Sequence, residues 1–210
     1  MNGNRVDGDR VQPDSVAGWR AWLAEHHGRP DGVWLVTWRA GSGGPRITYD
    51  ESVEQALCFG WVDSLGRALD EARTMLWFAP RKPRSGWSRP NKQRVERLQA
   101  AGLMAPAGLA VVEAAKADGS WTLLDAVEDL VVPDDLASAF AAHPPAREHW
   151  EAFPRSVKRG ILEWIVQARR PETRARRVAE TAERASRNER ANQWRGPGAR
   201  RPARSADPSG

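Results

Sequence analysis

The sequence predicts an α+β fold, with a small, mainly antiparallel sheet, flanking helices and an all-helical C-terminal half. Three observations indicate this class. Residues 33–38 are β-branched and aromatic, residues 61–79 alternate as a hairpin would, and helix start and stop signals recur from residue 90 onward. The 210 residues suffice for one domain with attached ends or for two small domains.

The first two predicted helices are defined by their ends. Ser15 can cap a helix over residues 15–27, since its hydroxyl can accept a hydrogen bond from a backbone N–H of the first turn. Thr48 and Glu51 have the capping-box spacing, in which each side chain bonds the other residue's backbone N–H. They open a helix over residues 48–60, which ends at a glycine.

The predicted strands are a buried one over residues 33–38 and a hairpin made of residues 61–69 and 74–79. A two-residue turn at Asp70-Glu71 would place Asp63 opposite Phe78. The core beneath the sheet is expected to hold Trp34, Leu35, Leu57 and Trp77.

Helices account for most of the remaining chain. Prolines at the start and glycines after the end predict helices over residues 90–101 and 106–117. Shorter helices are predicted over 121–129, 134–142, 145–152, 155–168 and 171–187.

Four regions follow from this pattern. They are a disordered N-terminus (1–13), an α+β body (14–129), a C-terminal helical region (130–187) and a disordered basic tail (188–210).

Composition excludes several classes of protein. No apolar run approaches the length of a membrane span, and the first residues lack the apolar segment of a secretory signal, so we expect a cytoplasmic protein without membrane insertion. The single cysteine, Cys58, excludes a disulfide framework, and a packing role is expected for it. The spacing of the four histidines gives no metal site, and no phosphate-loop motif is complete. Neither a metal nor a cofactor is expected, and the oligomeric state is left open.

The charge is unevenly distributed. The net charge is +5, yet residues 155–210 carry 15 Arg and Lys against 6 Asp and Glu, and residues 81–97 carry seven basic groups and one acid. Basic zones on an acidic body point to an anionic partner, such as a nucleic acid or a phosphorylated metabolite. A coding sequence rich in G and C would explain the excess of arginine equally well.

The stretch from residue 80 to residue 94 is the most informative for function. It interleaves cations with hydroxyls, an amide and one of the chain's eleven tryptophans, and leads into the N-terminus of a helix, where backbone N–H groups favour anions. The alternative is a solvated loop in which Ser88 merely caps that helix. The candidate binding residues are Asp63, Arg81, Lys82, Arg84, Ser85, Trp87, Ser88, Arg89, Asn91 and Lys92.

Asp63 and Arg81 are expected to face one site, because the hairpin returns the chain to the end of the strand that carries Asp63. One interpretation is an ion pair that holds the end of the hairpin. The other is that the pair leaves the remaining cations to receive an anion.

Four segments resemble the YdeI/OmpD-associated family, whose members are described as bacteriocin-protection proteins. These segments are Thr48–Asp63, Phe78–Asn91, Gly102–Gly108 and Leu162–Arg177. The resemblance extends over about residues 16–187 and implies an intracellular bacterial protein with a stress or bacteriocin-protection role. It brings no established reaction or cofactor.

Two functions therefore remain. The chain is either a non-enzymatic binding module for an anionic partner, or an enzyme for a small phosphorylated or carboxylated substrate. In the enzyme, Asp63 would act as acid or base beside Arg81, with Ser85 or Ser88 orienting the substrate. No nucleophile–base pair is readable in the sequence, which favours binding and leaves enzymatic activity uncertain.

Overall fold

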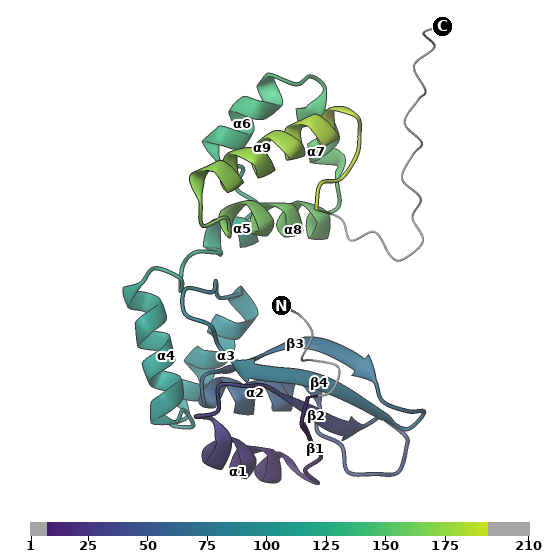
Figure 1. The fold of residues 1–210 in the computed structure, drawn as a ribbon, viewed down its shortest axis with the longest axis vertical. Coiled ribbons are helices and arrows are strands. Elements are labelled where there is room, and N and C mark those ends of the chain that lie inside the picture. The colour runs from purple at the N-terminus through teal and green to yellow at the C-terminus, as the bar shows by residue number, and fades with distance from the viewer. Residues whose placement is uncertain (1–7, 193–210) are drawn as a thin grey trace, which may run out of the picture. The chain divides into compact units, whose positions relative to one another are not determined.

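The computed structural model describes residues 8–192, and the chain divides into two compact units between Glu128 and Asp129 (Figure 1). The first unit combines a four-stranded sheet with helices, and the described part of the second unit is helical. The predicted α+β class is thus confirmed. No helix within residues 8–192 has the length and apolar character needed to cross a bilayer.

The sheet contains β1 (Arg10–Val11), β2 (Val33–Trp38), β3 (Trp61–Ala68) and β4 (Arg73–Pro80), in the order β1-β2-β4-β3. The β2–β4 and β3–β4 pairs are antiparallel, whereas β1 runs parallel to β2. The sheet is therefore mixed, which the sequence did not predict.

Strand β1 corrects the prediction of disorder for residues 1–13. Arg10 and Val11 pair with Trp34 and Leu35, and the N–H of Trp34 donates to the carbonyl of Asp9 at 2.8 Å. A two-residue strand has no periodicity to detect, because its order comes from the neighbouring strand and not from its own composition. Residues 1–7 lie outside the described part of the chain.

The β3–β4 hairpin differs from the predicted two-residue turn. Its connection spans residues 69–72, where the carboxylate of Asp70 accepts from the N–H groups of Ala72 and Arg73 at 3.0 and 2.7 Å. The longer connection shifts the register by one residue, and an irregularity between Asp63 and Gly66 shifts it back. Asp63 consequently pairs with Phe78 as predicted, although the turn was predicted wrongly.

The described part of the first unit, residues 8–128, also contains five helices: α1 (Val16–His26), α2 (Tyr49–Cys58), α3 (Arg89–Ala100), α4 (Pro106–Ala117) and α5 (Asp125–Glu128). The predicted caps are confirmed, since the hydroxyl of Ser15 accepts from the N–H of Gly18 and Thr48 forms the full capping box with Glu51. Helix α5 is shorter than the predicted helix over residues 121–129. The residues before it form turns instead, in which the N–H of Thr122 donates to the carbonyl of Gly119 and the N–H of Asp125 donates to the carbonyl of Thr122.

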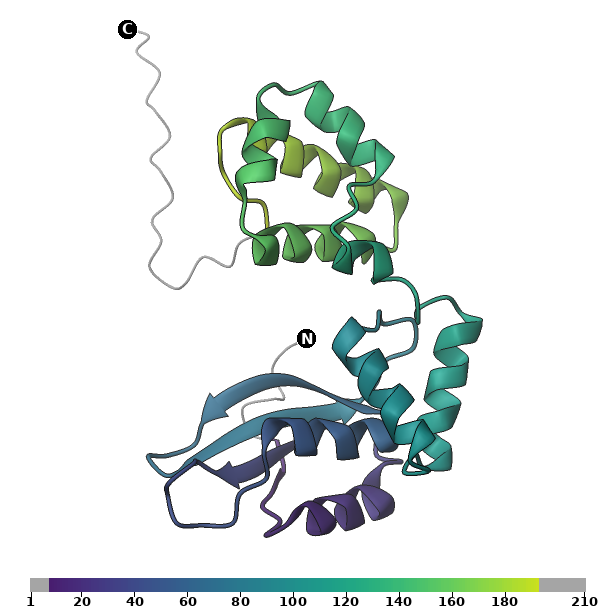
Figure 2. The same ribbon diagram turned by 180° about the vertical axis from the view of Figure 1, so that it is seen from behind.

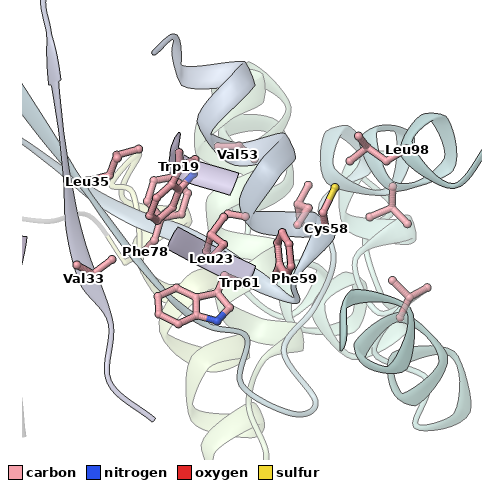
Figure 3. Close-up of a cluster of buried hydrophobic side chains, with 14 of the residues drawn as sticks. Trp19, Leu23, Val33, Leu35, Val53, Cys58, Phe59, Trp61, Phe78 and Leu98 are labelled. Carbon is pink, nitrogen blue, oxygen red and sulfur yellow. The ribbon is translucent and has the colours of Figure 1, made fainter. Parts of the chain in front are cut away.

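Helices α1 and α2 cover one face of the sheet (Figures 1 and 2). Trp19 and Leu23 of α1 are fully buried there with Leu35 and Phe78 of the sheet (Figure 3). Leu57 of α2 is buried in the same cluster. The Nε1–H of Trp19 donates to the carbonyl of Ser52 at 3.1 Å, so burial leaves the indole satisfied.

The opposite face of the sheet has its own cluster, which corrects the predicted single core. Trp34 and Trp77 are buried on that face with their ring centres 5.2 Å apart, whereas Leu35 lies in the helix-covered core. Neighbouring strand residues point to opposite faces, and a strand buried on both sides divides its apolar residues between two clusters.

The second unit contains α6 (Asp134–Ala141), α7 (Ala146–Ala152), α8 (Arg155–Val166) and α9 (Pro171–Ser186). Helix α9 packs against the other three, and Phe140 and Trp150 are buried with ring centres 5.3 Å apart. Ala191 is also buried, so the ordered chain extends past the predicted tail boundary at residue 188. Residues 193–210 lie outside the described part.

Candidate functional site

The loop that follows β4 folds back on itself before α3 begins. The N–H of Arg81 donates to the carbonyl of Gly60 at 2.9 Å, and the N–H of Ser85 donates to the carbonyl of Lys82 at 3.3 Å. Arg84 has a φ of 59°, a left-handed conformation uncommon for a residue with a side chain. The basic loop, residues 81–87, is therefore a defined turn with its own hydrogen bonds.

The guanidinium of Arg81 lies inside this turn. It stacks on the buried ring of Trp87, 3.8 Å from the ring centre, and its Nη2 donates to the carbonyls of Ser85 and Gly86. Burial lowers the pKa of Arg81 to about 10, and the negative charge of Asp63 opposes that shift. The side chain therefore remains charged at neutral pH.

One N–H of Arg81 remains without a protein partner. Its Nε is buried and makes no hydrogen bond within residues 8–192. A buried donor that loses water without gaining a partner costs about 1–3 kcal/mol, and more when it is charged. The Nε–H of Arg81 is therefore an unsatisfied donor on a buried, charged side chain.

A cavity of about 90 Å³ opens beside this arginine. This exceeds the ~10–15 Å³ that a cavity needs to hold one water, so there is room for several waters or for one small anionic group. Residues of the basic loop and of the α4 region line the cavity. They are Arg81, Lys82, Pro83, Arg84, Ser85, Trp87, Val111, Ala114, Ala115, Asp118 and Ser120.

Positively charged side chains outnumber negatively charged ones at the cavity. Arg81, Lys82 and Arg84 contribute three cations, against one carboxylate from Asp118. The N–H of Ser120 donates to that carboxylate at 2.9 Å; hydrogen bonding by Ser120, with help from Arg84, lowers the pKa of Asp118. The cavity therefore keeps a positive balance. The hydroxyl of Ser85 is already used, since it donates to the carbonyl of Lys82 at 2.7 Å.

The remaining predicted residues of the stretch point elsewhere. Lys92 forms an ion pair with Asp125 and lies 5.7 Å from the ring centre of Trp121. Arg89 is engaged within the protein. Ser88 occupies the N-cap position of α3, as the alternative interpretation had it, but its side chain makes no capping hydrogen bond.

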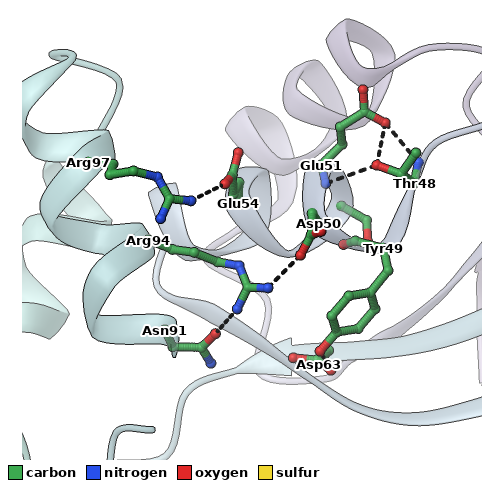
Figure 4. A network of polar contacts seen from close by, with 10 residues as sticks. Thr48, Tyr49, Asp50, Glu51, Glu54, Asp63, Asn91, Arg94 and Arg97 are labelled. Atoms are coloured by element: carbon green, nitrogen blue, oxygen red, sulfur yellow. Dashed lines mark hydrogen bonds and ion pairs between the residues drawn. The ribbon is translucent and has the colours of Figure 1, made fainter. Parts of the chain in front are cut away.

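Asp63 belongs to a separate polar network at the N-terminus of α2 (Figure 4). Its carboxylate accepts a hydrogen bond from the hydroxyl of Tyr49 at 3.0 Å. The guanidinium of Arg94 pairs with Asp50, donates to Asn91 Oδ1 at 3.0 Å and lies 6.0 Å from the ring centre of Tyr49. Burial, and then the negative charge of Asp63, raise the pKa of Tyr49.

The predicted residues thus divide between two places. Arg81, Lys82, Arg84, Ser85 and Trp87 surround the cavity, whereas Asp63 and Asn91 join the Tyr49 network. Asp63 and Arg81 do not form the predicted ion pair, because each has other hydrogen-bond partners, although the charge of Asp63 still acts on Arg81.

Sequence reasoning missed Tyr49. It is the single tyrosine of the chain and is 54% exposed, directly after the cap of α2. The signal available in the sequence was the position of this single tyrosine, directly after the predicted cap Thr48.

Cys58 is fully buried at the end of α2 (Figure 3). Burial raises the pKa of its thiol, and a hydrogen bond from Arg20 opposes the shift. A protonated, enclosed thiol is a weak nucleophile, which agrees with a packing role.

Two family models match this chain. Residues 11–111 match one described as Domain of unknown function (DUF8412), and residues 129–188 match one described as Bacteriocin-protection, YdeI or OmpD-Associated. The resemblance is therefore confirmed for the second unit, whereas the segments that carried it between residues 48 and 108 lie within the first model. No curated protein and no solved structure matches the chain.

Proposed function

We propose that the chain is a non-enzymatic binding module with a protective role, a role supported by the match of residues 129–188 to the family described as Bacteriocin-protection, YdeI or OmpD-Associated. Its ligand is an anion, which its first unit receives at the cavity beside Arg81. The ligand group is a single phosphate or carboxylate, carried by a metabolite or at the end of a larger molecule.

The observation that carries the proposal is that Arg81, which lines the cavity, is a buried cation with an unpaired Nε–H. A charged donor held in a fixed orientation is prepared for an anionic acceptor, and hydrogen bonds to ionised groups are about twice as strong as neutral ones. Lys82 and Arg84 add two exposed cations at the same cavity.

Binding has more support than catalysis. An enzyme that used Asp63 with Arg81 would need both groups on one substrate, yet Asp63 is hydrogen-bonded to Tyr49 and Arg81 to the carbonyls of its own loop. Ser85, one of the two serines assigned to orient that substrate, already donates its hydroxyl to the carbonyl of Lys82.

The test measures phosphate binding through the melting temperature of the full chain. Added inorganic phosphate should raise the melting temperature relative to chloride at equal ionic strength, because a ligand that binds the native state stabilises it. In the double variant Lys82→Ala/Arg84→Asn, phosphate affinity should fall by roughly tenfold, since exposed charge pairs contribute up to ~1 kcal/mol each. Asparagine suits the left-handed backbone of Arg84, so the variant tests charge without adding strain.

Two further variants separate the possibilities. Arg97→Ala removes an exposed cation that pairs with Glu54 away from the cavity and should leave the phosphate response unchanged. Asp63→Asn should also preserve phosphate binding, whereas an enzyme that used Asp63 would lose turnover. An unchanged response in the double variant would refute the cavity as the anion site.

The protective role has its own assay. Bacteria that express the wild-type chain should survive a panel of bacteriocins better than bacteria that express the double variant at the same level. Equal survival, together with the expected loss of phosphate binding, would separate protection from anion binding.

A further inference from the structure

A second, larger pocket lies at the other end of the first unit. Its volume is about 330 Å³, within the range of ~300–1,000 Å³ typical of small-molecule sites. Strands β2 and β4, the start of α2 and the connection over residues 39–48 supply its walls. None of the residues predicted from the sequence to bind a ligand lines it.

The pocket is built by hydrogen bonds that fix the connection. Thr37 on β2 receives the N–H of Ile47 on its hydroxyl at 2.9 Å and donates that hydroxyl to the carbonyl of Ile47 at 3.2 Å. These two hydrogen bonds join the ends of the segment that runs from Thr37 to Ile47. Gly44 lies so close to Trp38 that an added Cβ would stand 2.2 Å from a ring carbon. The connection is held against the tryptophan.

The inner surface is apolar. Leu35, Ile47 and Leu76 line it, with Trp38 and Tyr49 as aromatic walls. Thr37 and Ser52 also line it, but both hydroxyls donate inside the protein. Such walls favour a flat apolar body, because aromatic side chains contribute both area and stacking.

The charged side chains at the pocket are both cations. Arg39 and Arg46 both line it, both are exposed, and neither forms a side-chain ion pair within residues 8–192. Among residues 8–192, no Asp or Glu side chain lines the pocket. The nearby Glu51 is committed to Thr48, whose hydrogen bonds lower the pKa of Glu51, with a smaller contribution from Arg46.

We infer that this pocket binds a small molecule with a flat apolar body and one anionic group, such as an aromatic carboxylate or sulfonate. The apolar walls would take the body, and Arg39 with Arg46 would take the anion, since guanidinium groups match the geometry of such oxyanions. The site is distinct from the cavity at Arg81, because the two share no lining residue.

The test uses a matched pair of fluorescent probes with the full chain. These are 1-anilinonaphthalene-8-sulfonate and N-phenyl-1-naphthylamine, which carry the same rings with and without the sulfonate. The sulfonate should bind with one molecule per chain, more tightly than the uncharged amine, and benzoate should displace it where benzamide does not.

Two variants test the two halves of the inference. Arg39→Ala/Arg46→Ala should weaken the sulfonate by roughly fivefold to twenty-fivefold, since each exposed pair contributes up to ~1 kcal/mol, and should leave the amine unchanged. Ala40→Trp, at an exposed lining position, should weaken both probes by filling the pocket.

The control variant Lys82→Ala/Arg84→Asn should leave sulfonate binding unchanged, so failure of the phosphate cavity and failure of this pocket are distinguishable. Absence of sulfonate binding, or equal binding in the wild type and both pocket variants, would overturn the inference.

Discussion

Gly108 allows helix α4 to approach the end of helix α2, and replacing it with alanine tests how tightly the two helices are packed. A Cβ at residue 108 would stand 2.2 Å from the carbonyl oxygen of Cys58, whereas ordinary contact begins at 3.4 Å. Gly108→Ala therefore requires the helices to separate by about 1.2 Å, the difference between these two distances. The same carbonyl accepts the N–H of Ala105 at 3.0 Å, and that hydrogen bond would be stretched.

The expected magnitude follows from two opposing effects. Overpacking costs about 1–3 kcal/mol, and the upper end applies because the atom in the way is backbone and cannot rotate aside. The greater helix propensity of alanine offsets at most about 1 kcal/mol. A net loss of about 2 kcal/mol should lower the melting temperature of the first unit by roughly 8 °C, at ~4 °C for each kcal/mol.

Gly160 in α8 supplies the matched control. No atom lies within 4 Å of a Cβ added at residue 160, so Gly160→Ala should stabilise the second unit by about 0.5–1 kcal/mol. Differential scanning calorimetry of the full chain can follow both changes. If Gly108→Ala melts at the wild-type temperature, the close contact between α2 and α4 does not exist and the reasoning fails.

Two more predictions concern single side chains. Tyr49 is the one tyrosine of the chain, so the alkaline rise in phenolate absorbance reports it alone; it should titrate above its ordinary pKa of 10.0, and Asp63→Asn should lower that pKa. Because the folded pKa is raised, the stability that Tyr49 contributes is complete below the unfolded value and is lost as the pH rises through the folded one. For buried Cys58, a thiol reagent at neutral pH should label the unfolded chain promptly and the native chain slowly. A tyrosine that titrates below pH 10, or prompt stoichiometric labelling of the native thiol, would contradict these assignments.

Local signals in the sequence predict most of the helices and strands. The capping box of Thr48 and Glu51, the glycine at residue 60 and the prolines at residues 90 and 106 mark helix ends through interactions between neighbours. Strand β1 carries no such signal, because two residues gain order from pairing with β2.

The candidate site was less predictable, because its contacts join distant residues. Lys92 pairs with Asp125, 33 positions away, and Asp63 meets Tyr49 across a helix and a turn. A run of cations shows that positive charge is present; it does not show which cations the fold neutralises. Arg81, expected to reach outward, instead stacks on Trp87 within its own loop.

The register shift in β3 also affects how readily two molecules can associate through the edges of their sheets. β3 and β1 are the two outer strands of the sheet, and unpaired outer strands are templates on which a second molecule can add a strand. The irregularity between Asp63 and Gly66 interrupts the even spacing of N–H and C=O groups on β3, and β1 offers only two residues. Both borders of the sheet are therefore poor starting points for aggregation.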